Sequence, residues 1–176
     1  MILALGRKGR TTTRRPILRI PRSPINVVVD VVAFAGVVVC IVTVVGSWNA
    51  LPEAIPQHFR LWGRSDAWCG RWILVFLCVV VAMMYVVMSV AHRFPYQFRP
   101  AGWVTERNKA RQYRIAISLV AWLKAEFVWM ITLSVWNIVR VALGKAEGLG
   151  VLFTTGWFAV LGTTVAVHLV VSYRSR

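Results

Sequence analysis

The chain has 176 residues, of which 58% are hydrophobic and only 15% are charged, and its mean hydropathy is +0.64. A soluble domain carries about 45–50% apolar and about 25% charged residues, and a chain this short cannot bury such an excess in a protein core. The composition therefore argues against a soluble domain. The basic residues behind the net charge of +15 lie mainly between the apolar runs and come with no nucleic-acid-recognition motif, which argues against a nucleic-acid partner.

Residues 1–24 form a basic segment with seven Lys and Arg residues and no acid. Three prolines, at positions 16, 21 and 24, oppose a continuous helix, which predicts a flexible cytoplasmic tail. The apolar run that follows is longer than the roughly 7–15 residues of a cleavable signal sequence. We therefore expect it to remain in the mature protein as a membrane anchor.

Four apolar runs follow the tail, at residues 25–48, 72–91, 115–139 and 149–173. Each is close to the ~20 residues that an α-helix needs to cross about 30 Å of hydrocarbon. The first two are rich in valine, which favours strands in water, but in lipid a lone run becomes helical because its backbone must satisfy its own hydrogen bonds. The predicted fold class is all-α, a four-transmembrane-helix bundle over residues 25–176 with an ordered extracytoplasmic loop between helices 1 and 2.

The loops predict the orientation of this bundle. The N-terminal tail, the second loop and the C-terminus lie on one side and carry 15 Lys and Arg residues, against five on the other side. Because such residues mark the cytoplasmic side, we expect a multi-pass protein of the plasma (cell) membrane with both termini in the cytoplasm. The loop at residues 49–71 then lies outside, and the basic side meets anionic lipid headgroups of the bilayer.

Two sequence patterns stand at fixed distances from the predicted span ends. The first, in the external loop, comprises Leu51, Pro52, Ile55, Pro56, His58, Phe59, Gly63 and Asp66. The second precedes the third span in the cytoplasmic loop and comprises Thr105, Asn108, Gln112, Tyr113 and Arg114.

These patterns resemble a family of small membrane proteins that carry the domain of unknown function 1648, over roughly residues 26–176. The Leu123-Lys124 pair and the Ala142-Leu143-Gly144 sequence are similar as well. The family pattern is not matched at every position of the external loop: Arg60 replaces an Asn, Ser65 replaces a frequent Pro, and Arg71 replaces a Lys.

Relatives in this family include SdpI-like immunity proteins of Gram-positive bacteria. They protect the producing cell from a secreted toxin and relay a signal by holding a repressor at the membrane. The resemblance therefore implies a role in toxin or peptide resistance, with a peptide toxin outside or a protein regulator inside as the partner.

His58 and Asp66 are the candidate functional side chains of the external loop. Three interpretations are open: a recognition surface, a weak metal site, or a structural cap. In the cap, prolines stiffen the chain, and Asp66 either caps the second helix or pairs with Arg64 or Arg71. A cap and a recognition surface are compatible, because loops held by a scaffold often carry function. A metal site usually has more ligands, so we expect none.

The predicted spans also contain ionisable residues, which are Asp30, Lys124, Glu126 and His168. Counted from Ile115, Lys124 lies near the middle of its span, where an unpaired charge costs at least a few kcal/mol. Lys124 and Glu126 are two positions apart and point to nearly opposite sides of a helix, so each needs another partner. The partners that we expect are Asp30, His168, Thr132 or Asn137, and the set is either a polar relay or interhelical glue with snorkelling.

In the second loop, Thr105 fits the N-cap of the third helix, and Glu106 then lies in the first turn. The basic residues that follow contact either anionic lipid or the acidic face of a regulator. Cys40, Cys69 and Cys78 show neither a disulfide pattern nor a zinc-binding pattern. Since no catalytic or nucleotide-binding motif is present, we expect no enzyme activity and no cofactor.

Three functions remain compatible with these patterns. The first is a sensor or immunity-type protein, with the external loop for recognition and the basic cytoplasmic loop for output. The second is a small transporter or transporter subunit that uses the intramembrane charges, and the third is a membrane scaffold or assembly factor. A bundle of four helices is small, which leaves room for an oligomer.

Overall fold

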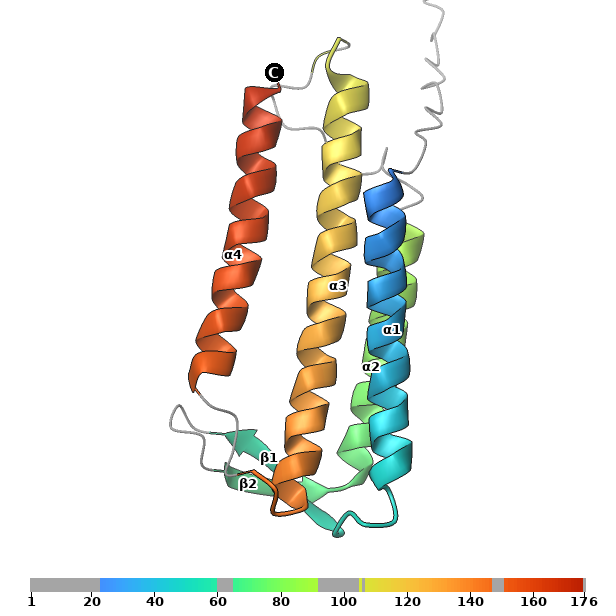
Figure 1. Cartoon of the computed structure of the whole chain (residues 1–176), viewed down its shortest axis with the longest axis vertical. Coiled ribbons are helices and arrows are strands. Elements are labelled where there is room, and N and C mark those ends of the chain that lie inside the picture. The colour runs from blue at the N-terminus through green and yellow to red at the C-terminus, as the bar shows by residue number, and fades with distance from the viewer. Residues whose placement is uncertain (1–22, 60–64, 92–104, 106, 147–150, 176) are drawn as a thin grey trace, which may run out of the picture.

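The computed structural model describes residues 23–59, 65–91, 105, 107–146 and 151–175. These residues form four long helices that run side by side, with two short strands at one end of the bundle (Figure 1). The helices are α1 (Pro24–Ser47), α2 (Trp72–Ala91), α3 (Lys109–Ala142) and α4 (Val151–Arg174). Each is long and apolar enough to cross a membrane, which confirms the predicted four-helix bundle and a multi-pass membrane protein. The predicted tail, residues 1–24, lies almost wholly outside the described residues.

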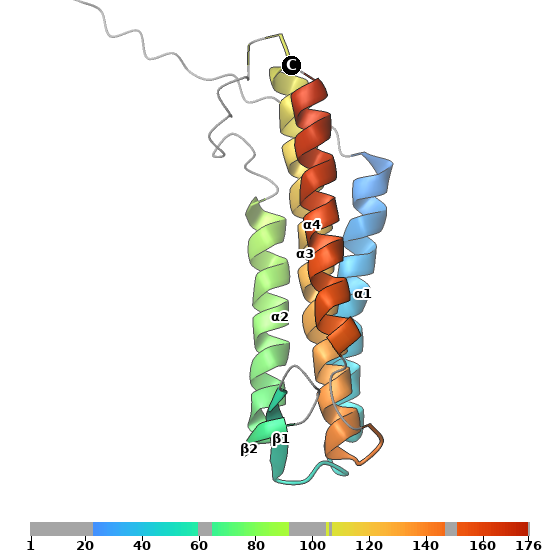
Figure 2. The same cartoon turned by 90° about the vertical axis from the view of Figure 1, so that its left-hand side faces the viewer.

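Helix α3 is the centre of the bundle. It contacts α1, α2 and α4, and α1 also packs against α2. Helix α4 lies on the opposite side of α3 from α1 and α2 (Figure 1), and α1 and α2 flank the α3–α4 pair in the perpendicular view (Figure 2). Large apolar side chains of α1, α2 and α4 face outward, as expected for helices surrounded by lipid.

Helix α1 buries a single face. Its buried residues recur at intervals of three or four positions, with Gly36 and Val37 as one adjacent pair, and are Asn26, Val29, Ala33, Gly36, Val37, Cys40 and Val44. Side chains at this spacing lie in one stripe along a helix, and this stripe faces α3 and α2. The valines between these positions point outward.

Helices α1 and α3 approach each other closely at Gly36. A Cβ atom at this position would stand 2.7 Å from Cγ1 of Val128 and 3.3 Å from the ring of Trp129. The short separation lets Thr132 Oγ1 donate to the Gly36 carbonyl at 3.0 Å, and Trp129 Nε1 donates to the Val32 carbonyl at 3.0 Å. Small residues at a helix crossing and side-chain hydrogen bonds across it are how membrane helices associate.

Two helix ends have a local explanation in the sequence. Helix α1 begins at Pro24, whose fixed φ suits the first turn and whose missing N–H costs no hydrogen bond there. Helix α3 ends in a Schellman turn, in which Lys145 N donates to the Arg140 carbonyl and Gly144 N to the Val141 carbonyl. Gly144 has a φ of +68°, a conformation that glycine adopts without strain.

The connection between α1 and α2 contains an antiparallel pair of strands, β1 (Ala54–Phe59) and β2 (Ser65–Gly70). Ala54 lies opposite Gly70 and Ile55 opposite Cys69, and the register is irregular on both sides of His58. Leu51 and Ile55 are buried against the ends of α1, α2 and α3. The two strands were not predicted from the sequence, because prolines and short polar stretches in this loop resemble a turn-rich connection.

Candidate functional site

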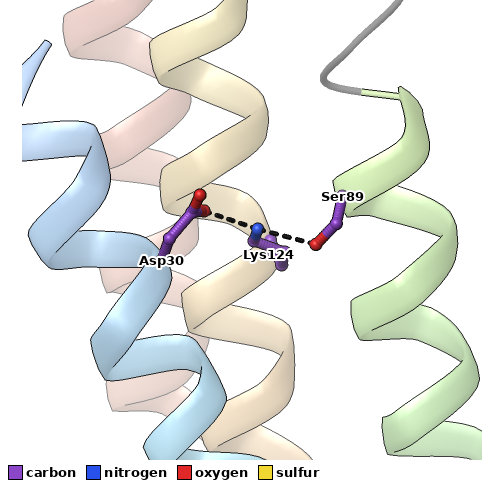
Figure 3. Close-up of polar contacts among 3 residues, drawn as sticks. All are labelled: Asp30, Ser89 and Lys124. Atoms are coloured by element: carbon purple, nitrogen blue, oxygen red, sulfur yellow. Dashed lines mark hydrogen bonds and ion pairs between the residues drawn. The ribbon is translucent and has the colours of Figure 1, made fainter. Parts of the chain in front are cut away.

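The ionisable residues of the spans meet at an interface of three helices. Lys124 of α3 points at Asp30 of α1, with its Nζ 2.5 Å from Oδ1, and also donates to Oγ of Ser89 of α2 at 3.0 Å (Figure 3). The ammonium also stands 4.8 Å from the ring centroid of Tyr85. Lys124 is only 1% exposed, so this group of contacts takes the place of water around its charge.

The sequence predicted Asp30 as a partner of Lys124 but did not predict the contributions of α2. Ser89 and Tyr85 each stand among apolar residues in a span that carries no Asp, Glu, Lys, Arg or His. Polar residues in an otherwise apolar span are the signal that would have identified them. With these two residues, the Lys124 site joins α1, α2 and α3.

The Lys124 site lies at different heights along its three helices. Lys124 lies near the middle of α3, about 22 Å from Lys109, but Asp30 is only about 9 Å from the start of α1 and Ser89 about 3 Å from the end of α2. The site therefore lies toward the end of the bundle that holds the start of α1. Helix α3 begins six residues before Ile115, at Lys109, and extends about 13 Å beyond α1 at this end.

Glu126 faces the opposite side of α3 from the Lys124 site. Its Oε1 accepts a hydrogen bond from Oγ1 of Thr164 of α4, and its Oε2 has no hydrogen-bond partner among the described residues. His168, one turn further along α4, contacts the Thr164 carbonyl through Nδ1 at 2.8 Å and Oγ of Ser118 through Nε2 at 3.4 Å. Glu126 and His168 thus lie in one α3–α4 cluster, while Asp30 and Lys124 lie in another site.

Thr132 and Asn137, the two other expected partners of the charged residues, form hydrogen bonds with backbone carbonyls instead. Thr132 donates to the Gly36 carbonyl, and Nδ2 of Asn137 donates to the Leu133 carbonyl of its own helix. The expectation that either residue pairs with Lys124 or Glu126 is therefore wrong. Both lie more than one helical turn past Glu126, toward the strand end of α3.

The basic segment before the third span is helical. Residues 109–114 form the first turns of α3, with Arg111 and Arg114 exposed, Tyr113 half-buried and Gln112 buried. Nε2 of Gln112 donates to the Ser172 carbonyl at 2.8 Å, and Oγ of Ser172 donates back to Gln112 Oε1 at 2.6 Å. This pair of bonds fixes α3 to the end of α4. We call the surface of Lys109, Arg111, Arg114 and Arg174 the basic end.

Thr105 does not cap α3, contrary to the expectation from the sequence. The N-cap position is Asn108, whose side chain makes no capping hydrogen bond. Asn108 Oδ1 instead accepts from the backbone N–H of Thr105 at 2.7 Å. An asparagine that bonds a nearby backbone group competes with the cap geometry, and here it closes a turn before the helix. Glu106 lies outside the described residues.

At the opposite end of the bundle, Arg71 ties the strands to the helices. Its Nη1 donates to the carbonyls of Trp48 and Leu51, each at 3.5 Å, and its guanidinium stands 4.8 Å from the Trp48 ring. Its backbone N–H donates to the Glu53 carbonyl at 3.0 Å. The aromatic rings of Trp48 and Trp72 stack edge-on, with centroids 5.1 Å apart.

The predicted residues of the external loop are only partly described. Leu51 and Ile55 are buried and Pro52 is exposed, whereas His58 and Asp66 are placed only by their backbones, in β1 and β2. Asp66 therefore cannot be the N-cap of α2, which begins at Trp72. Pro56 and Phe59 also lie in β1, and Gly63 and Arg64 lie outside the described residues.

The cysteines are free thiols in the described structure. Cys40 of α1 and Cys78 of α2 face each other with their sulfur atoms 3.6 Å apart, and Cys69 lies in β2. Burial raises the pKa of the Cys69 thiol above its ordinary value. Among the described residues, no group of three or more His, Cys, Asp or Glu side chains could hold a metal ion.

These features describe a multi-pass membrane protein with a small strand pair over one end of a helical bundle. Residues 35–83, which cover the second half of α1, both strands and the first part of α2, match the family model described as Domain of unknown function (DUF1648). The match supports the assignment of the chain to this family and confirms the resemblance inferred from the external loop. No curated protein and no solved structure was found to match the chain.

Proposed function

We propose that the protein is a membrane sensor of the immunity type. In this proposal the strand pair lies outside the cell and recognises a peptide, the basic end lies in the cytoplasm, and α3 connects the two. The protein is located in the cell membrane with both termini inside, binds a regulator or anionic lipid at the basic end, and catalyses no reaction.

The observation that carries this proposal is the extent of α3. At one end, Ile138 and Val139 of α3 pack in the same core as Leu51 and Ile55, which anchor β1. At the other end, α3 continues into the basic end. Its 34 residues give a length of about 50 Å, which exceeds the roughly 30 Å of a hydrocarbon core. One rigid element therefore contacts the strands and also reaches past the start of α1.

The charge distribution supports the orientation. Arg111 and Arg114 are exposed on the part of α3 that extends beyond α1, and Arg174 lies at the adjacent end of α4. Lys and Arg residues at membrane boundaries favour the cytoplasmic side and are attracted to its anionic lipids. A regulator with an acidic face would meet the same charges.

A deletion strain tests the proposal directly. Cells lacking the protein are challenged with a panel of membrane-active peptides, and the minimal inhibitory concentration of each peptide is compared with that of complemented cells. We expect sensitivity to at least one peptide, restored by the wild-type protein. Unchanged sensitivity to the whole panel would remove the immunity function.

Three variants separate recognition from output. Trp68→Ala changes an exposed residue of β2, and the double change of Arg111 and Arg114 to Gln removes charge from the basic end. Both are expected to lose protection while the protein remains in the membrane. Phe158→Ala is the matched control, because Phe158 is an exposed aromatic residue on the outer face of α4. Equal loss of protection in Phe158→Ala would contradict the assigned roles.

A transporter is the second candidate, and the buried charges of the spans favour it. Asp30 and Lys124 are held in one site, and Glu126 and His168 in another, so a polar path would have to pass around α3. Lys124→Ala and Glu126→Gln distinguish this function from interhelical glue. If both variants fold and keep full activity in resistance and flux assays, transport through these residues is excluded.

A further inference from the structure

We propose that Cys40 and Cys78 form a site of reversible covalent modification, an intramolecular disulfide that joins α1 to α2. The two sulfur atoms belong to different helices and lie 3.6 Å apart, and the Cys78 thiol also lies 3.9 Å from the Cys40 carbonyl oxygen. This site is independent of the Lys124 site and of the basic end.

The geometry requires only a small movement. A disulfide bond brings its sulfur atoms to about 2.0 Å, so the two thiols must approach by about 1.6 Å. Cys40 is fully buried and Cys78 is half-buried, so Cys78 gives the oxidant its access. A thiol pair that served only as apolar packing would not need the two sulfurs to face each other across the helix interface.

The chemistry follows from the location of the thiols within the spans. Cys40 is about 10 Å from the end of α1, and Cys78 is about 9 Å from the start of α2. A lipid-soluble two-electron acceptor of the quinone class reaches this depth. The S–H bonds of Cys40 and Cys78 break, one S–S bond forms, and the two electrons and two protons reduce the quinone to a quinol.

The disulfide would restrain the helices whose core packs against the strand pair. Cys40 and Leu74 share a core with Leu51 and Ile55, and Cys78 packs against the same core. A covalent link between α1 and α2 therefore fixes the two helices from which the strands emerge. If the proposed sensing function holds, the oxidised protein responds less to a peptide at the strands than the reduced protein does.

Oxidation of the purified full-length protein in lipid nanodiscs tests this inference. The reduced protein is treated with tetramethylbenzoquinone, whose ring carbons are all substituted and so do not add thiols. The protein is then denatured and labelled with a maleimide, so that the buried Cys40 thiol is also accessible to the label. We expect three labels before oxidation and one afterwards, together with a mass loss of two hydrogen atoms that peptide mapping assigns to Cys40 and Cys78.

Single variants provide the controls. Cys69→Ser is expected to form the same link, because Cys69 takes no part in it, whereas Cys40→Ser and Cys78→Ser are expected to keep both remaining thiols. A link that includes Cys69, or retention of all three thiols after quinone treatment, overturns the inference. The readout is chemical, so its failure leaves the proposed sensing function standing, and an unchanged peptide sensitivity leaves the disulfide standing.

Discussion

The Asp30–Lys124 pair offers a quantitative test of how the three helices are held together. Asp30→Asn removes the negative charge and leaves the Lys124 ammonium, which is 1% exposed, with uncharged neighbours alone: the new amide, the Ser89 hydroxyl and the Tyr85 ring. Breaking one side of a buried ion pair costs about 3–5 kcal/mol. Because Asp30 is 18% exposed and two other contacts remain, we expect the lower limit, about 3 kcal/mol in the free energy of unfolding.

Removal of both charges should behave differently. In the double variant, Asp30→Asn with Lys124→Met, neither charge of the pair remains, and uncharged side chains of similar volume do not carry the desolvation cost of the two ions. We expect the double variant to lie within about 1 kcal/mol of the wild type, since isosteric core replacements usually cost less than ~1.5 kcal/mol. The difference between the double variant and the sum of the single variants is then the coupling free energy of the pair.

Reversible unfolding in mixed micelles measures these values, with helix content and the fluorescence of the nine tryptophans as independent probes. Arg111→Gln is the control, because Arg111 is exposed and its loss should change stability by less than about 0.5 kcal/mol. If Asp30→Asn costs less than about 1 kcal/mol and the single effects simply add, the pair does not hold the helices and the reasoning is refuted.

Three further predictions concern packing. Gly36→Ala should destabilise the protein by about 1–3 kcal/mol in the same unfolding assay, because the new Cβ meets Val128 at 2.7 Å. Gly46→Ala, with open space around it, should not, and equal effects of the two changes would contradict the close crossing of α1 and α3. Thr132→Val should cost roughly 0.6–1.7 kcal/mol by loss of its bond to α1, and Thr163→Val, whose hydroxyl bonds only its own helix, should cost less. Arg71→Gln should speed limited proteolysis between α1 and α2, since it removes the contacts with Trp48 and Leu51; an unchanged cleavage rate would show that they do not hold the strands.

The helices could be predicted from the sequence because lipid leaves the backbone few alternatives. The predicted second span coincides with α2, and the first and fourth differ from α1 and α4 by one or two residues at each end. The third differs most, since α3 begins at Lys109. Charged residues there ended the apolar run but not the helix, because a helix that leaves the hydrocarbon can continue in water.

The candidate site could be predicted only in part. A buried lysine needs a partner, which led to Asp30, but which serine or tyrosine completes the site depends on how α2 is rotated against α3. The same rotation decides that Cys40 faces Cys78. Hydropathy defines the length of a span and carries little information on its rotation, because apolar residues surround these helices on nearly every side.

Accessibility of single cysteines from outside the cell tests whether the strand pair lies outside and the basic end inside. A chain without its three native cysteines receives one cysteine, in place of Glu53 beside the strands, of Lys145 after α3, or of Arg111 at the basic end, and intact cells are treated with a membrane-impermeant maleimide. We expect labelling at positions 53 and 145 and protection at position 111 until the membrane is opened. Labelling of position 111 in intact cells, with protection at position 53, would contradict this orientation.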